Sequence, residues 1–193
     1  VRSASDSAAM SAGELWMAVT AASLRGLCQD RPPHAGAAAT QTGEPVDAND
    51  LVTFREIEEL KYRYTRALDH KDWALFRDCF VADATATYGE RLEFGSADEI
   101  VAYMQGNLGN NMITVHQLHH PELTVDGDTA TGTWSLMDRV IMTDYRLLLD
   151  GASTYQDRYV RCDDGAWRIA HTGYERIYEQ MVSFDDVPSF NLT

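Results

Sequence analysis

The stretch LVTFREIEELKYRYTRALD, residues 51–69, decides the fold of this chain. Its apolar side chains recur at the three- and four-residue spacing of a helix with one buried face. These positions are Ile57, Leu60, Tyr64, Ala67 and Leu68. Asp69 falls in the last turn. The spacing therefore predicts one long amphipathic helix, from which the rest of the fold can be built outward.

Two shorter helices are expected downstream of this stretch. Asp72 can cap a helix that begins with Trp73 and extends as far as Phe80, and Ser96 can cap a helix that carries Ile100. Both capping residues stand directly before a run with helical apolar spacing. The first half of the chain is therefore expected to be helical.

The second half has the pattern of paired strands. Residues 123–125 lead through Asp-Gly-Asp into residues 130–142, and residues 155–162 lead through Asp-Asp-Gly into residues 167–178. Helices followed by antiparallel strands predict an α+β domain in which a curved antiparallel sheet wraps around the long helix. The space between helix and sheet is the natural place for a pocket.

The first fifty residues differ in composition from the rest. They are rich in Ala, Ser, Gly and Thr, and residues 31–45 resemble a flexible linker, although residues 14–27 are compatible with a short helix. We expect an N-terminal tail over residues 1–50, one domain over residues 51–184 and a C-terminal tail over residues 185–193.

The charge of the chain excludes several classes of partner. With 30 acidic and 16 basic side chains in 193 residues, the net charge is -14, which repels phosphate backbones and anionic membranes. No segment approaches the roughly 20 apolar residues that cross a bilayer. Cys28, Cys79 and Cys162 lack metal or redox spacing. We expect free thiols, a cytoplasmic protein, and neither nucleic acid nor membrane as a partner.

Several polar residues stand where apolar ones would be expected. Tyr64 and Asp69 lie on the amphipathic helix, His116 enters a strand, and counting by twos from Trp134 places Asp138 on the inner face. Buried ionisable groups are costly unless paired, so this set predicts an enclosed acid/base pocket. Asp138 could either pair with a structural arginine or orient a catalytic histidine. Tyr64 and Asp69 are separated by about 140° around an ideal helix, so spacing alone does not place both in one pocket.

Metal and cofactor sites have no support in the sequence. His116, His119 and His120 lie close together before Pro121, but they lack the further ligands of a zinc site, and the two adjacent histidines cannot both face inward. Glycine-rich phosphate loops and the Gly-x-Ser-x-Gly turn are also missing. We therefore expect no metal and no cofactor.

Separated motifs in a fixed order carry a resemblance over about residues 54–184. They are ELKYRY at 59–64, Leu68-Asp69, Trp73, TVH at 114–116, PELTVD at 121–126, ATGTW at 130–134, Asp138-Arg139 and TGYERIYE at 172–179. In these motifs the chain resembles the SnoaL-like branch of the nuclear transport factor 2-like superfamily. Within that branch it is most similar to the bile acid 7α-dehydratases, and more distantly to the scytalone dehydratases.

The resemblance implies a cone-shaped α+β barrel, a homotrimer, and a cofactor-free lyase that removes water from a hydrophobic cyclic ketone of steroid-like or polyketide-like type. It implies a catalytic set, namely Tyr64, Asp69, His116 and Asp138. It also implies a substrate-binding set, namely Tyr88, His119 and Arg176. An isomerase or cyclase, or a binding module without catalysis, are the alternatives in the same fold.

Each catalytic residue has an expected role in that dehydration. His116 would transfer the proton, Tyr64 would donate to the developing enolate oxygen, Asp138 would orient His116, and Asp69 would bind or protonate the leaving hydroxyl. Residues 145–149, YRLLL, depart from the bile acid enzymes, which leaves the substrate open.

Overall fold

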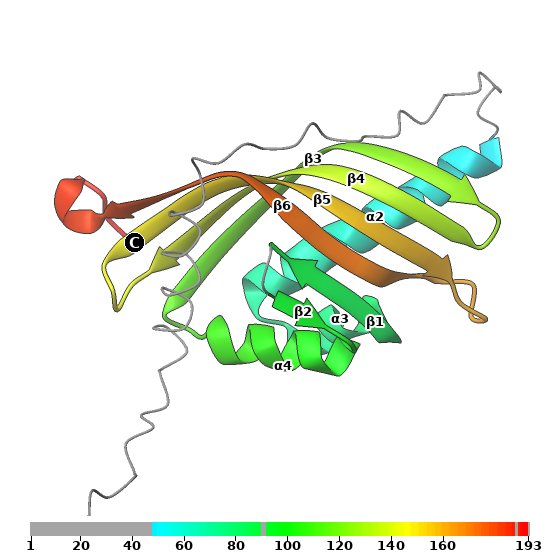
Figure 1. The fold of residues 1–193 in the computed structure, drawn as a ribbon, viewed down its shortest axis with the longest axis horizontal. Helices are drawn as coiled ribbons and strands as arrows, with labels where there is room; N and C mark the ends of the chain where they lie inside the picture. Colours follow the sequence, from blue (N-terminus) through cyan, green and yellow to red (C-terminus); the bar gives the residue numbers. More distant parts are fainter. Residues whose placement is uncertain (1–47, 90–91, 188, 193) are drawn as a thin grey trace, which may run out of the picture. The chain divides into compact units, whose positions relative to one another are not determined.

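The computed structural model describes residues 48–89, 92–187 and 189–192, and its first element is the expected long helix, α2 (Ala48–His70) (Figure 1). The five apolar positions that predicted this helix are all at most 2% exposed. The expected N-terminal tail, its short helix over residues 14–27 and Cys28 lie outside the described residues, except that Ala48–Asp50 begin α2. Periodicity alone therefore identified the buried face of α2.

Two capped helices follow, as expected. Asp72 Oδ1 accepts a hydrogen bond from Leu75 N at 3.0 Å at the start of α3 (Trp73–Asp78), and Ser96 Oγ accepts from Glu99 N at 3.2 Å at the start of α4 (Ala97–Asn107). The extension of α3 to Phe80 is wrong. Phe80 instead begins a strand because it pairs with Ile169 in the sheet, and tertiary pairing overrides the local helical pattern.

Six strands form one sheet in the order β2-β1-β6-β5-β4-β3. Their bounds are β1 (Phe80–Tyr88), β2 (Leu92–Phe94), β3 (Met112–Asp126), β4 (Thr129–Met142), β5 (Leu147–Arg161) and β6 (Trp167–Ser183). Both expected hairpins, β3–β4 and β5–β6, are confirmed, with longer strands than the sequence indicated. The sheet is mixed rather than wholly antiparallel, because β1 runs parallel to β6.

The sheet curves over α2, with α3, α4 and the short strand β2 grouped below it in the view of Figure 1. β3 is an edge strand, and among the strands α2 packs chiefly against β3. The seam between α2 and β3 is where the last turn of the helix meets the predicted histidine strand. The contact between α2 and β3 therefore determines where the candidate site lies.

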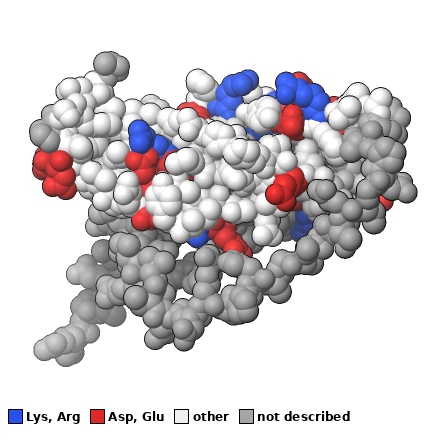
Figure 2. Space-filling view, turned by 90° about the horizontal axis from the view of Figure 1, so that it is seen from above, with Lys and Arg blue, Asp and Glu red and all other residues white. Residues whose placement is uncertain are grey.

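In the described part of the chain, no helix has both the length and the hydrophobicity that a bilayer span requires. On the face seen in Figure 2, lysine and arginine side chains form small separate groups with acidic side chains beside them. This face therefore carries mixed rather than uniformly basic charge.

The core contains an ion pair that the sequence analysis did not identify. Lys61 Nζ lies 2.8 Å from Asp157 Oδ2, and both side chains are fully buried. The ammonium also lies 3.7 Å from the centre of the Tyr155 ring and 4.4 Å from that of Tyr64. Burial lowers the pKa of Lys61, and the attraction of Asp157 opposes that change.

Hydroxyl groups complete this buried network. Tyr159 donates to Asp157 Oδ2 at 2.6 Å, Thr172 donates to Oδ1 at 2.7 Å, and Trp134 Nε1 donates to the Tyr159 hydroxyl at 2.9 Å. Both carboxylate oxygens of Asp157 are therefore satisfied, which is what allows a charge to remain in the core.

Candidate active site

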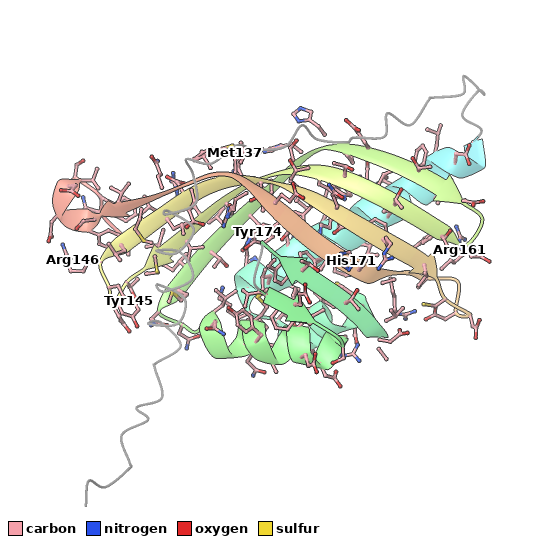
Figure 3. All side chains as sticks on the ribbon, viewed as in Figure 1. Met137, Tyr145, Arg146, Arg161, His171 and Tyr174 are labelled. Atoms are coloured by element: carbon pink, nitrogen blue, oxygen red, sulfur yellow. The ribbon has the colours of Figure 1, made fainter. Side chains whose placement is uncertain are left out.

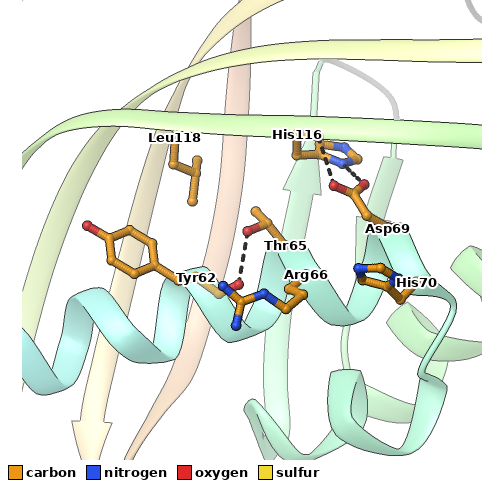
Figure 4. A pocket seen from close by; sticks show the side chains of 7 residues that line it. All are labelled: Tyr62, Thr65, Arg66, Asp69, His70, His116 and Leu118. Carbon is orange, nitrogen blue, oxygen red and sulfur yellow. Dashed lines mark hydrogen bonds and ion pairs between the residues drawn. The ribbon is translucent and has the colours of Figure 1, made fainter.

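Asp69 and His116 meet across the seam between α2 and β3. Asp69 Oδ1 lies 2.6 Å from His116 Nδ1, and Asp69 Oδ2 accepts the backbone N–H of His116 at 2.9 Å (Figure 4). One carboxylate from the last turn of the helix thus holds both the backbone and the ring of the same histidine. This fixes the imidazole more firmly than a single contact could.

The protonation of this pair follows from its contacts. Burial opposes ionisation of Asp69, but hydrogen bonds from the ring and backbone of His116 and from the Thr114 hydroxyl lower its pKa below the usual value. An ionised carboxylate can only accept hydrogen bonds, so Nδ1 of His116 carries a proton. In the neutral ring, Nε2 then holds the lone pair that a general base needs.

Lys71 contacts Thr114, which neighbours Asp69 on the side away from His116. Lys71 Nζ donates to Thr114 Oγ1 at 2.8 Å and to the Leu68 carbonyl at 3.3 Å. Because an ammonium group can only donate, the Thr114 oxygen accepts from Lys71, and the single Thr114 proton is free for Asp69. The order of donation is therefore Lys71 to Thr114 to Asp69, with His116 donating to Asp69 from the other side.

The backbone conformation of Lys71 explains how its side chain can contact Thr114 on β3. It has φ 60°, a left-handed conformation that ends α2 and turns the chain. The sequence suggested only that the helix ends near His70 and Lys71. Nothing in it indicated that the lysine side chain turns back toward β3.

A cleft of about 340 Å³, the α2–β3 groove, opens beside the pair. Seven residues line it, namely Tyr62, Thr65, Arg66, Asp69, His70, His116 and Leu118 (Figure 4). The groove therefore combines an imidazole held by a carboxylate with phenol, hydroxyl and guanidinium groups, and Leu118 adds an apolar surface.

Asp138 lies on the inner face of β4, as counting by twos indicated, and is 6% exposed. It is the register partner of His116, yet both of its carboxylate oxygens bind Arg176: Oδ2 accepts from Nη2 at 2.8 Å, and Oδ1 accepts from Nη1. The expectation that Asp138 orients His116 is wrong, because Arg176 occupies its carboxylate. Asp69 has that position instead, rather than being free to bind the leaving hydroxyl.

Gly151 makes the Asp138–Arg176 pair possible. It stands opposite Asp138 in register, and a Cβ at Gly151 would lie 2.5 Å from Arg176 Nη1. Ser153 Oγ accepts from Arg176 at 3.1 Å, and Glu179 Oε2 lies 3.3 Å from its Nε. The guanidinium therefore occupies space that any side chain at Gly151 would need.

The two predicted site tyrosines lie together in the core. The hydroxyls of Tyr64 and Tyr88 are 3.4 Å apart, and burial raises the pKa of both well above the usual value. Tyr88 stacks on Tyr174, which lies under the guanidinium of Arg176 at 5.1 Å. These tyrosines thus adjoin Arg176, and neither lines the α2–β3 groove.

His119 does not face the groove, contrary to expectation. It is exposed, three residues after His116 and therefore on the opposite face of β3. A bulge follows between His119 and Glu122, where His120 has φ 49° and is also exposed. Among the described residues, no three His, Cys, Asp or Glu side chains gather as a metal site would require.

The family model of the SnoaL-like domain matches residues 50–173. Uncharacterized proteins of Mycobacterium tuberculosis and Mycobacterium bovis are 27% identical over 132 residues, which cover 66% of this chain and 87% of theirs.

Solved structures share the fold. A protein from Novosphingobium aromaticivorans assigned as a scytalone dehydratase aligns with a TM-score of 0.64 and 20% identity, over 68% of this chain and 88% of that one. The hexachlorocyclohexane dehydrochlorinase LinA-type3 from Novosphingobium barchaimii aligns with a TM-score of 0.62 and 15% identity, over 68% and 91%. At these identities the likeness concerns the fold alone.

Proposed function

We propose that this chain, which belongs to the SnoaL-like domain family, is a cofactor-independent lyase that removes water from a hydroxylated cyclic ketone of steroid-like or polyketide-like type. One observation carries the proposal: Asp69 holds His116 in the tautomer of a general base, beside an open groove. The names of the two solved neighbours, a dehydratase and a dehydrochlorinase, denote eliminations of this kind.

The reaction needs one group that both takes and returns a proton. Nε2 of His116 removes the proton on the carbon next to the carbonyl, and the electron pair of that C–H bond becomes the enolate. The C–O bond then breaks as the alkene forms, and the imidazolium gives its proton to the departing hydroxide, which leaves as water. Such positioned proton transfer accelerates reactions by roughly 10² to 10⁴. Asp69 stabilises the intermediate imidazolium.

The carbonyl oxygen needs a hydrogen-bond donor at the groove. Tyr64 was the expected donor, but the phenol that lines the groove belongs to Tyr62, two residues earlier on α2. Burial and the nearby Glu58 carboxylate raise the pKa of Tyr62, against the effect of Arg55, so its hydroxyl keeps its proton. We assign the enolate-stabilising role to Tyr62.

The test is an assay for water loss from cyclic β-hydroxy ketones, followed by the absorbance of the conjugated alkene. Formation of the alkene with release of water supports the lyase. Migration of a double bond without water loss would make the protein an isomerase, and ring closure would make it a cyclase. Binding without turnover across the series would assign it as a binding module.

Substitution of Lys71 by methionine is expected to lower kcat with little change in KM. The lost hydrogen bond to Thr114 is charge-assisted, and such a bond corresponds to roughly a tenfold to hundredfold effect. Lys71→Arg should retain most of the wild-type kcat. Thr114→Val should lower kcat through the same hydrogen bond, so the double variant should have a kcat close to that of Thr114→Val alone. Steady-state kinetics across pH would measure this, and wild-type kcat in Lys71→Met would contradict it.

We also propose a homotrimer, assembled through the outer face of the sheet. Met137, Ala152 and Tyr178 form a cross-strand row there, and Met137 lies above the sheet in Figure 3. Met137 and Tyr178 are 47% and 44% exposed. Apolar surface of this kind is typical of interfaces. Light scattering should give three times the chain mass of 21.6 kDa, and a stable monomer would contradict the proposal.

A further inference from the structure

The α2–β3 groove has two unlike walls. Tyr62, Arg66 and His70 recur every four residues and form one ridge of α2, while His116 and Leu118 form the facing wall on β3. Figure 4 shows Arg66 between Tyr62 and His70 along the helix. A guanidinium group thus stands at the centre of the wall that faces the acid/base pair.

Arg66 differs from most arginines of the described chain in lacking an acidic partner. The arginines that form ion pairs are Arg55, Arg77, Arg139, Arg146, Arg161, Arg168 and Arg176. The guanidinium group of Arg66 makes no hydrogen bond or ion pair with any residue that the structure describes. This is notable in a protein whose net charge is -14, where carboxylates outnumber cations.

The other charges beside the groove are already engaged. Asp69 accepts two hydrogen bonds from His116, and the Lys71 ammonium donates to Thr114. Within the described residues, Arg66 is therefore the groove's one permanent charge without a counterion. A single uncompensated cation matches a monoanion, whereas a dianionic phosphate would leave a negative charge beside Asp69 in an acidic protein.

We propose that Arg66 binds a carboxylate on the substrate, so that the substrate class is a cyclic hydroxy ketone that also carries a carboxylic acid. This inference rests on the proposed function and narrows it. A guanidinium binds a carboxylate through two parallel hydrogen bonds, which orients the ligand as well as holding it. Leu118 and the Tyr62 ring contact the apolar part of such a ligand.

The spacing of the groove fits this class. Arg66 and Asp69 are separated by about 4.5 Å along the helix axis, three residues at the usual rise. A molecule whose carboxylate is about one ring away from the reacting carbon can therefore contact Arg66 and His116 together. The carboxylate anchors the ring, and His116 acts on the C–H bond that this anchoring presents.

Binding of a matched pair of probes tests the inference without turnover. The probes are 2-naphthoate and 2-naphthamide, which have similar size and shape and differ in charge. The wild-type protein should bind the naphthoate roughly tenfold to a hundredfold more tightly, as expected for charge-assisted hydrogen bonds. Arg66→Gln should remove this preference. Arg63→Gln is the matched control, because Arg63 is exposed on the same helix but does not line the groove.

Calorimetry of the three proteins at low and moderate salt gives the result. Equal affinity for the two probes in the wild type, failure of both to bind, or a naphthoate preference that survives Arg66→Gln would each overturn the inference. The preference should persist in His116→Ala, because that change removes the proposed base and not the anion site. If the protein prefers naphthoate through Arg66 but dehydrates no hydroxy ketone, the anion site is supported and the proposed lyase function is rejected.

Discussion

Replacement of His116 by alanine is expected to abolish measurable dehydration while the protein remains folded. Among the described residues that line the groove, only His116 has an imidazole bound by a carboxylate, so its loss should remove the proton transfer and lower kcat by at least roughly 10² to 10⁴. The change leaves a small cavity beside Leu118 at the groove surface. Circular dichroism and a thermal melt would confirm that the fold is retained, and alkene absorbance would measure the rate.

Two further variants show whether the effect is chemical. Asp69→Asn should lower kcat by a similar order, because the asparagine amide can donate to Nδ1 and so favours the tautomer with its proton on Nε2. His119→Ala is the matched control, since this exposed histidine lies on the opposite face of β3. Wild-type rates in His116→Ala, or equal losses in His119→Ala, would reject the mechanism.

Replacement of Lys61 by methionine is expected to destabilise the fold by about 3–5 kcal/mol, the usual result of leaving one partner of a buried ion pair alone. Asp157 would remain in the core with its charge opposed only by hydroxyl groups. Urea denaturation would measure the loss as a lower midpoint at an unchanged slope.

The double variant Lys61→Met with Asp157→Asn should recover part of that stability. Asparagine is neutral, and its carbonyl oxygen can still accept from Tyr159 or Thr172. Arg55→Met provides the surface control, because the pairs of Arg55 with Glu58 and Glu59 are exposed and contribute at most about 1 kcal/mol. A Lys61→Met midpoint equal to that of Arg55→Met would show that the buried charge pair contributes little.

The sequence predicted the elements whose patterns are local. Apolar spacing identified α2, side-chain caps identified the starts of α3 and α4, and Asp-Gly turns identified both hairpins. The strand β1 was missed because its long pairing is with β6, which is distant in the chain and parallel, while its local partner β2 is only three residues long. Alternation correctly placed Asp138 on the inner face of β4.

Two residues predicted from the sequence, Asp69 and His116, line the α2–β3 groove, but the sequence did not predict that they pair with each other. Burial requires that Asp138 be paired, yet it does not say whether His116 or Arg176 is the partner, since both lie within reach on the same face of the sheet. The contact between Asp69 and His116 depends on where α2 ends against β3, which periodicity does not specify. Lys61 carried a usable signal, because it lies within the apolar stripe of α2.

The contact between Asp69 and the backbone of His116 has a consequence for the edge of the sheet. β3 is an edge strand, and the unpaired N–H groups of an edge strand can template the addition of a strand from another molecule. Asp69 occupies one of these N–H groups, and α2 packs along the same edge. The carboxylate that binds the His116 ring therefore also protects this edge of the sheet from strand addition, so one side chain serves both the candidate site and the monomeric state of the edge.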